Sequence, residues 1–197
     1  MTFPPVDVSG VRVLPAASFP SIRAELGSLL AGDADGTPPY HGDTPAENVL
    51  SVDVVGIDGI DDLLPRALDR TRRGGLHLPV VVHERHTSVG PLTTPGYAAC
   101  VQCAGYRGLF DPVLPRDGAV GPGEPDDVPP LTAKLVAVTA AREIERITRR
   151  AGTLPLTLGG MVRVDHTTGT VGIENVSQID GCEMCASLIE CVLQGVL

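Results

Sequence analysis

The sequence predicts an α/β protein containing a parallel sheet, and three segments support this prediction. Residues 47–57 (ENVLSVDVVGI) and 77–86 (HLPVVVHERH) are apolar runs rich in β-branched residues, as expected of strands buried on both faces. Residues 60–75, between them, begin with aspartates and end with arginines and two glycines, which is typical of a helix. A strand, a helix and a strand within about forty residues form a βαβ unit, which requires parallel pairing and a right-handed crossover.

The segments before this unit predict one more strand and one more helix. Residues 11–15 (VRVLP) read as a short strand. Residues 18–32 read as a helix, with Ser18 as a candidate N-cap and Pro20 in the first turn. The polar stretch 33–48 is rich in glycine and proline and predicts a loop.

The segments after it predict a loop, two helices and a hairpin. Residues 108–130 are rich in proline, glycine and aspartate, which indicates a long exposed loop. Residues 131–152 are the strongest helix candidate, residues 166–169 predict the turn of a β-hairpin, and residues 185–197 predict a short apolar helix. The apolar face expected of the strongest helix comprises Val136, Ala140, Ile144, Ile147 and Ala151.

Length and composition limit the class of protein. The 197 residues suit one compact domain, with an α/β part at 1–96 and a cysteine-containing part at 97–197. A formal charge of −9 argues against a nucleic-acid partner, because phosphate binding needs a basic surface. No run of eighteen apolar residues and no signal-peptide pattern occurs, so we expect a cytoplasmic protein without a membrane span.

Two cysteine pairs are the most informative feature. Cys100 and Cys103 form one Cys-x-x-Cys pair, and Cys182 and Cys185 form another. Each pair supplies two corners of a tetrahedron, so together they predict one closed, structural zinc site per chain. A redox-active pair, an iron–sulfur cluster and chance burial of four thiols are the alternatives. The fifth cysteine, Cys191, reads as a core residue of the last helix.

The run LPVVVHERHTSVGPLTTPGYAACVQCAGYR (78–107) resembles a segment of ThiF/MoeB-type, ubiquitin-activating-like adenylating enzymes. The residues that carry the likeness are Val89-Gly90-Pro91-Leu92, Pro95-Gly96, Cys100, Cys103 and Arg107. It is similar above all to the branch that partners YcaO-type cyclodehydratases, which form thiazoline and oxazoline rings in ribosomally made peptides. The resemblance covers about residues 48–190 and implies a partial Rossmann-type sheet with a zinc module.

The sequence also departs from that family. It contains no G-x-G-x-x-G phosphate loop, and its first 47 residues are too few for the family's ATP-binding half, so we assign no cofactor-binding or catalytic residue. The resemblance makes Asp58 and Asp61 candidates for magnesium ligands. Acidic residues that stabilise a helix N-terminus are the simpler interpretation.

The run His83-Glu84-Arg85-His86 does not have the H-E-x-x-H spacing of a zinc protease. If it lies at a strand end, His83 and His86 point to opposite faces. We therefore expect a solvated strand terminus there.

These observations lead to three functional hypotheses. The first is a zinc-stabilised scaffold that binds a precursor peptide or a partner enzyme in the biosynthesis of a modified, antibiotic-type peptide. The second is a catalytic subunit that shares an ATP-dependent active site with a partner, with Asp58, Asp61 and Arg107 near a shared cleft. The third is a zinc-stabilised subunit of an unrelated assembly. A truncated sheet leaves edges to cover, so we expect a homodimer or a hetero-complex.

Overall fold

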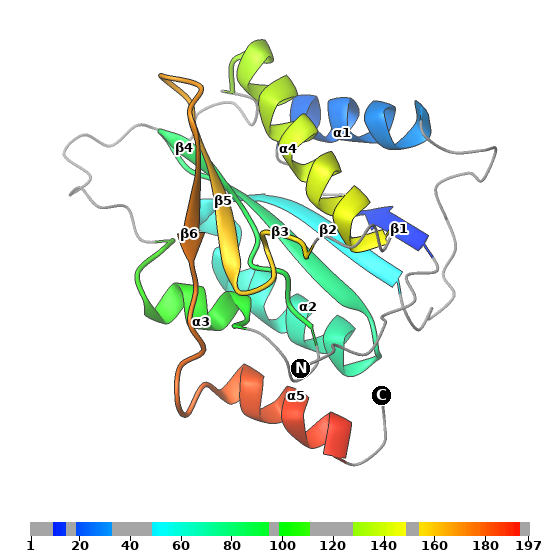
Figure 1. Ribbon diagram of the computed structural model, residues 1–197, viewed down its shortest axis with the longest axis vertical. Helices are drawn as coiled ribbons and strands as arrows, with labels where there is room; N and C mark the ends of the chain where they lie inside the picture. The colour runs from blue at the N-terminus through cyan, green and yellow to red at the C-terminus, as the bar shows by residue number, and fades with distance from the viewer. Residues whose placement is uncertain are drawn as a thin grey trace.

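The computed structural model describes residues 10–14, 19–32, 49–94, 99–110, 128–148 and 154–193. Its centre is a six-stranded mixed sheet in which the strands lie side by side in chain order (Figure 1). The strands are β1 (Gly10–Val13), β2 (Val49–Gly56), β3 (Leu76–Val82), β4 (His86–Val89), β5 (Gly160–Asp165) and β6 (Val171–Asn175). The predicted α/β class with a C-terminal hairpin is confirmed.

The first three strands are parallel and the last three pairings are antiparallel. The helix α2 (Ile60–Arg72) connects β2 to β3, which confirms the predicted βαβ unit. β2 and β3 are buried along almost their entire length, because helices cover both faces of the sheet at this point.

Two helical layers enclose the sheet. The helices α1 (Pro20–Gly32) and α4 (Pro130–Thr148) cover one face (Figure 1), where they pack on Val52, Val54 and Val80. The helices α2, α3 (Val101–Tyr106) and α5 (Glu183–Leu193) cover the other face, with Val55 and Val81 beneath them. No helix in these described ranges is long and apolar enough to cross a lipid bilayer.

The predicted strand over residues 77–86 is wrong in its second half. β3 ends at Val82, and the chain reverses through a tight turn into the antiparallel strand β4. The backbone N–H of His83 donates to the carbonyl of His86 at 2.8 Å, and Glu84 and Arg85 are exposed at the tip of the turn. The polar run HERH is therefore the connection of a hairpin rather than the end of one strand.

Several other predictions hold with shifted boundaries. The hairpin turn at residues 166–169 is confirmed, and Gly169 adopts a positive φ of 68° there. The predicted apolar face of α4 is confirmed at Val136, Ala140 and Ile144, which are buried. The predicted N-cap Ser18, the loop 33–48 and the helix residue Ala151 lie outside the described residues.

The predicted loop over 108–130 is only partly described, since residues 111–127 lie outside the described ranges. Its described ends differ from the expectation of an exposed segment. Phe110 is 4% exposed and Val128 is 7% exposed, because each packs into one of the two apolar clusters that lie on the two faces of the sheet. The division into parts at residue 96 stays a prediction, and the sheet pairing of β4 with β5 runs across it.

A buried, hydrogen-bonded pair of polar side chains lies beneath α2. His77 Nε2 is 2.9 Å from Asp53 Oδ2, both side chains are fully buried, and Arg66 Nη1 lies 3.8 Å from Asp53 Oδ1. Burial would raise the pKa of Asp53, but the hydrogen bond to His77 and the charges of Arg70 and Arg66 hold it below its usual value. Burial likewise lowers the pKa of His77, which keeps the ring neutral beside the carboxylate.

The first prediction concerns this pair. Asp53→Ala should lower the free energy of unfolding by about 1–3 kcal/mol, because it leaves the buried imidazole of His77 without its hydrogen-bond partner. Urea unfolding followed by circular dichroism measures the change. Asp69→Ala is the control. It removes a carboxylate from an exposed pair with Arg73 and should cost less than about 1 kcal/mol. Equal losses in both variants would contradict a special role for Asp53.

Candidate metal centre

The first cysteine pair lies at the start of α3. Cys100 directly precedes the helix and Cys103 lies in its first turn. The segment after β4 is fixed against the start of β3, because Thr93 and His77 exchange backbone hydrogen bonds at 2.8 and 3.2 Å. The Thr93 hydroxyl also accepts from Val101 N at 3.4 Å. The sheet therefore determines where the first pair is placed.

The second pair has the same local architecture. Cys182 directly precedes α5 and Cys185 lies in its first turn. The chain enters through Gly181, whose φ is +80°, and Cys182 N donates to the Ile179 carbonyl at 3.1 Å. Both pairs thus sit at helix N-termini, where the backbone dipole favours negatively charged sulfur.

The fold brings the two pairs together into one four-sulfur cluster. The Sγ atom of Cys100 lies 3.7 Å from that of Cys103, 3.6 Å from that of Cys182 and 3.5 Å from that of Cys185. The Sγ atoms of Cys103 and Cys185 are 3.5 Å apart, and all four lie within 4.8 Å of one another. A tetrahedral ion with sulfur at ~2.3 Å requires sulfur–sulfur edges of ~3.8 Å. These separations fit such an ion and are much longer than the ~2.05 Å of a disulfide.

Burial favours a structural centre. The four side chains are between 0% and 5% exposed, whereas redox-active cysteines lie in partly exposed surroundings. The cluster could therefore hold a metal ion with four protein ligands, which leaves no open coordination position. The assignment of these four cysteines as ligands, and of zinc as the metal, remains a prediction.

The thiols influence one another's ionisation. The contact with Cys185 and burial raise the pKa of Cys100, and the same contact lowers the pKa of Cys185 to about 5. Burial raises the pKa of Cys182 to about 11. Several thiolates this close together repel one another, and a divalent cation removes that repulsion.

Neighbouring groups orient the cluster. Gln102, between the cysteines of the first pair, accepts from Met184 N at 2.9 Å through its Oε1 atom, which also lies 3.4 Å from Cys182 Sγ. Ile179 N donates to Cys103 Sγ at 3.4 Å. Arg107 Nε donates to the Ser177 carbonyl at 3.1 Å and fixes the segment that leads to the second pair. Such outer contacts orient first-sphere ligands in metal sites.

The three residues proposed for a shared active site lie on or directly beside three different helices. Asp58 lies in the short 3-10 helix η1 (Ile57–Gly59) and Asp61 lies in the first turn of α2, and both are exposed. Asp61 also lines a cavity between α2 and α3. Arg107 is engaged with the backbone of Ser177. The positions of the two aspartates agree with the helix-terminus interpretation.

The prediction that His83 and His86 point to opposite faces is wrong. Their rings stack with centroids 4.1 Å apart and an interplanar angle of 15°, and Phe110 stacks on His83 at 6.4 Å. The rings meet because the two residues flank a hairpin turn rather than sharing a strand. His83 is 8% exposed, so this is no solvated terminus.

The environment of the stacked rings suppresses protonation. Burial, followed by the nearby charge of His86 and Arg163, lowers the pKa of His83 to about 3. Burial and Arg163 lower the pKa of His86 to about 4. The Nε2 atoms of both rings are buried and have no hydrogen-bond partner within the part of the chain that the structure describes. The Nε2 atom of His166 shares a hydrogen bond of 2.8 Å with the Thr87 hydroxyl, so this third histidine is held by a contact outside the stacked pair.

Sequence reasoning missed several residues that shape the site. Only the position of Gln102 inside the first pair could have indicated its contact with the second pair. A polar residue at that position is equally compatible with a side chain that points into solvent. The Asp53–His77 pair joins residues 24 positions apart, and only their place in otherwise apolar strands could have pointed to it. Buried polar residues in such strands require a partner.

Comparison with known proteins identifies the fold. No protein-family model matches the sequence, and no curated protein matches it. A heterocyclase solved in complex with substrate and cofactor aligns with a TM-score of 0.58 and 15% identity, over 92% of this chain and 25% of that one. A chain of the E. coli microcin synthetase McbBCD complex aligns with a TM-score of 0.61 and 12% identity, over 93% and 70% of the two chains.

These similarities show a shared fold. The chain spans about a quarter of the heterocyclase's length and 70% of the synthetase chain. The resemblance inferred from the sequence is confirmed at this level, because the structural neighbours include a heterocyclase and a microcin synthetase.

The second prediction tests the metal centre. Cys103→Ser should reduce bound zinc from one ion per chain to a small fraction, because it removes one of four ligands. Loss of the ion should lower stability by several kcal/mol, since metal binding is coupled to folding. Elemental analysis and thermal unfolding measure the two effects. Cys191→Ser serves as the thiol control and should retain the metal. Metal-free wild-type protein with unchanged stability would contradict the assignment.

The third prediction concerns acid stability. The ordinary pKa of histidine is about 6.5, and the folded-state pKa values of His83 and His86 are about 3 and about 4. The two neutral rings therefore make their full contribution to the free energy of unfolding above about pH 6.5. This contribution is lost as the pH falls toward these folded-state pKa values. When the pH falls from 7 to 5, each ring should lower the free energy of unfolding by roughly 1 kcal/mol, after allowance for partial solvent screening.

The matched variant for this prediction is the double substitution His83→Phe and His86→Phe. It keeps the stacked rings and removes their protonation, so its Tm should fall less steeply between pH 7 and 5 than that of the wild type. Loss of metal in acid affects both proteins, so the difference in slope isolates the two rings. Parallel Tm profiles would show that the rings do not contribute.

Proposed function

We propose that this chain is a zinc-stabilised accessory or scaffold protein in the biosynthesis of a ribosomally synthesised, post-translationally modified peptide. It would bind the precursor peptide, a modifying enzyme, or both. The observation that carries the proposal is the closed set of four buried sulfur atoms, set in a fold shared with a heterocyclase and a microcin synthetase chain. An ion held by four protein ligands organises structure and offers no position for a substrate.

Binding without independent catalysis fits the remaining features. The sequence contains no G-x-G-x-x-G loop to hold ATP phosphates. Arg107, one residue of the catalytic alternative, already donates to a backbone carbonyl that supports the second cysteine pair. Asp61 beside the α2–α3 cavity is the one observation that favours a catalytic subunit completed by a partner.

Association with other chains is part of the proposal. β1 and β6 occupy the two ends of the described sheet, and each pairs with a neighbour on one side within it. Val171 and Ile173 on β6 are 51% and 58% exposed. Exposed edge strands with apolar side chains need covering, which supports a homodimer or a hetero-complex. As part of the same proposal, we place this complex in the cytoplasm of an antibiotic-producing cell.

The fourth prediction tests this function. A native mass spectrum of the purified protein should show one zinc ion per chain and no nucleotide adduct when Mg-ATP is added. Ring formation by the source genome's YcaO-type cyclodehydratase on its precursor peptide should fall at least tenfold when this chain is omitted. Addition of the chain loaded with zinc should restore it.

Two results would contradict the proposal. A stoichiometric ATP adduct, or exchange of pyrophosphate into ATP by the chain alone, would identify an adenylating enzyme. Full ring formation in the absence of the chain would show that it has no part in this modification. The Cys103→Ser variant serves as the metal-free comparison in the same assay.

A further inference from the structure

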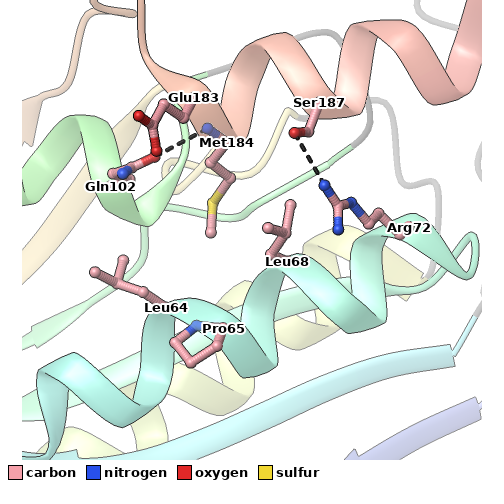
Figure 2. A pocket seen from close by; sticks show the side chains of 8 residues that line it. All are labelled: Leu64, Pro65, Leu68, Arg72, Gln102, Glu183, Met184 and Ser187. Carbon is pink, nitrogen blue, oxygen red and sulfur yellow. Dashed lines mark hydrogen bonds between the residues drawn. The ribbon is translucent and has the colours of Figure 1, made fainter.

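The outward side of α2 forms the floor of a groove, and α3 and α5 form its walls. One cavity of about 240 Å³ lies between α2 and α5, and Figure 2 shows the side chains that line it. A second cavity of about 290 Å³ lies between α2 and α3. Leu64 and Gln102 line both cavities, so the two are adjacent parts of one groove.

The floor of the groove is an apolar stripe. Ile60, Leu64 and Leu68 are four residues apart along α2 and therefore occupy one face over ~12 Å. They are partly buried against the core below but remain accessible from the groove. The side chains of Leu64, Leu68 and Met184 converge on the cavity in Figure 2. The groove thus offers contact to apolar side chains.

The rim of the groove carries an excess of negative charge. Asp61 at one end and Glu183 on α5 are exposed carboxylates that line the cavities. Among the described residues that line the two cavities, Arg72 is the one cation, and its Nη2 atom donates to Ser187 Oγ across the groove at 3.0 Å. An occupant with Lys or Arg beside its apolar residues complements this rim.

The cysteine pairs hold the two walls together. α3 begins with Cys100 and Cys103, α5 begins with Cys182 and Cys185, and the four sulfur atoms join the helices. Gln102 adds the bond to Met184 N at the junction of the two cavities, which Figure 2 shows as a dashed line. The groove therefore depends on an intact cluster.

The size of the groove favours a short segment over a folded domain. The cavities are lined by eight and nine residues, two of them shared. A standard interface between folded proteins uses about 20–30 residues on each side. Each cavity has the volume for one or two side chains, which suits a linear peptide with apolar anchors.

We propose that this groove binds a short segment of the precursor peptide, in which two apolar side chains are flanked by Lys or Arg. The inference deepens the proposed function and rests on it. The apolar side chains occupy the two cavities over Leu64, and the cationic groups lie beside Asp61 and Glu183. In this proposal the metal centre holds α3 and α5 in place as the walls of the groove.

The fifth prediction tests this site with a fluorescein-labelled peptide of twelve residues made of Leu, Ala and Lys, and with its counterpart in which Glu replaces Lys. Fluorescence anisotropy should show saturable binding of the Lys peptide to the zinc-loaded protein, at least tenfold tighter than binding of the Glu peptide. Leu68→Glu should weaken binding of the Lys peptide at least tenfold. Val138→Glu is the matched control. Val138 lies on α4 across the sheet and is 46% exposed, so its variant should bind within twofold of the wild type.

A second variant keeps the test decisive if Leu68→Glu fails to fold. The double substitution Asp61→Lys and Glu183→Lys changes two exposed positions and should reverse the preference between the two peptides. Metal content, measured for every variant, should stay at one zinc per chain. Equal binding of both peptides, absence of saturable binding, or an unchanged preference in the charge-reversed variant would each overturn the groove assignment.

The two proposals can fail separately. If the charge-reversed variant keeps its metal and still restores ring formation by the cyclodehydratase, the groove is not the peptide site and the proposed function stands. If the groove binds the Lys peptide as predicted but the chain is dispensable for ring formation, the groove binds peptides in another process and the proposed function fails.

Discussion

The contact among four buried sulfur atoms joins two parts of the chain that lie far apart in the sequence. Cys100 and Cys182 are 82 residues apart, and their Sγ atoms are 3.6 Å from each other. Closing so long a segment costs conformational entropy, and the sequence has only 3% aromatic residues with which to build compensating contacts. A metal ion bound by the four thiolates would supply that free energy at one point. This contact, together with the packing of Met184 and Leu188 into the core under α2, positions α5 and so forms the groove.

The sheet places each half of the cluster by a different route. The first pair follows a segment bonded directly to β3 through Thr93, so the parallel half of the sheet positions it. The second pair follows β6, and Arg107 returns from the end of α3 to hold the intervening segment at Ser177. The centre therefore links the parallel and antiparallel halves of one sheet. A helix N-terminus behind each pair adds favourable electrostatics for thiolate sulfur.

The proposed function and the groove are consistent with these separate roles of the sheet and the sulfur cluster. The βαβ unit provides a rigid floor, because α2 is packed on β2 and β3 above the buried Asp53–His77 pair. The cluster provides the walls, and carboxylates at helix starts provide the charge. A binding protein needs a preformed surface more than it needs a reactive group. The proposed recognition of a cationic, apolar peptide segment agrees with the formal charge of −9 of this chain.

The sequence by itself determined the elements whose signal is local. The βαβ unit, the helix with Val136 and Ile144 on one face, the hairpin at Gly169 and the two cysteine pairs all follow from periodicity, turn residues and ligand spacing. Tertiary structure alone decided which distant residues meet. The chain reversal at His83–His86 could not be predicted from the sequence, because a short apolar run followed by polar residues is equally compatible with a strand end and with a hairpin. The Asp53–His77 pair, the bridge from Gln102 to Met184 and the groove above Leu64 depend on the register between strands and on how helices pack. Those choices are made by the summed burial of the whole core, which no single segment encodes.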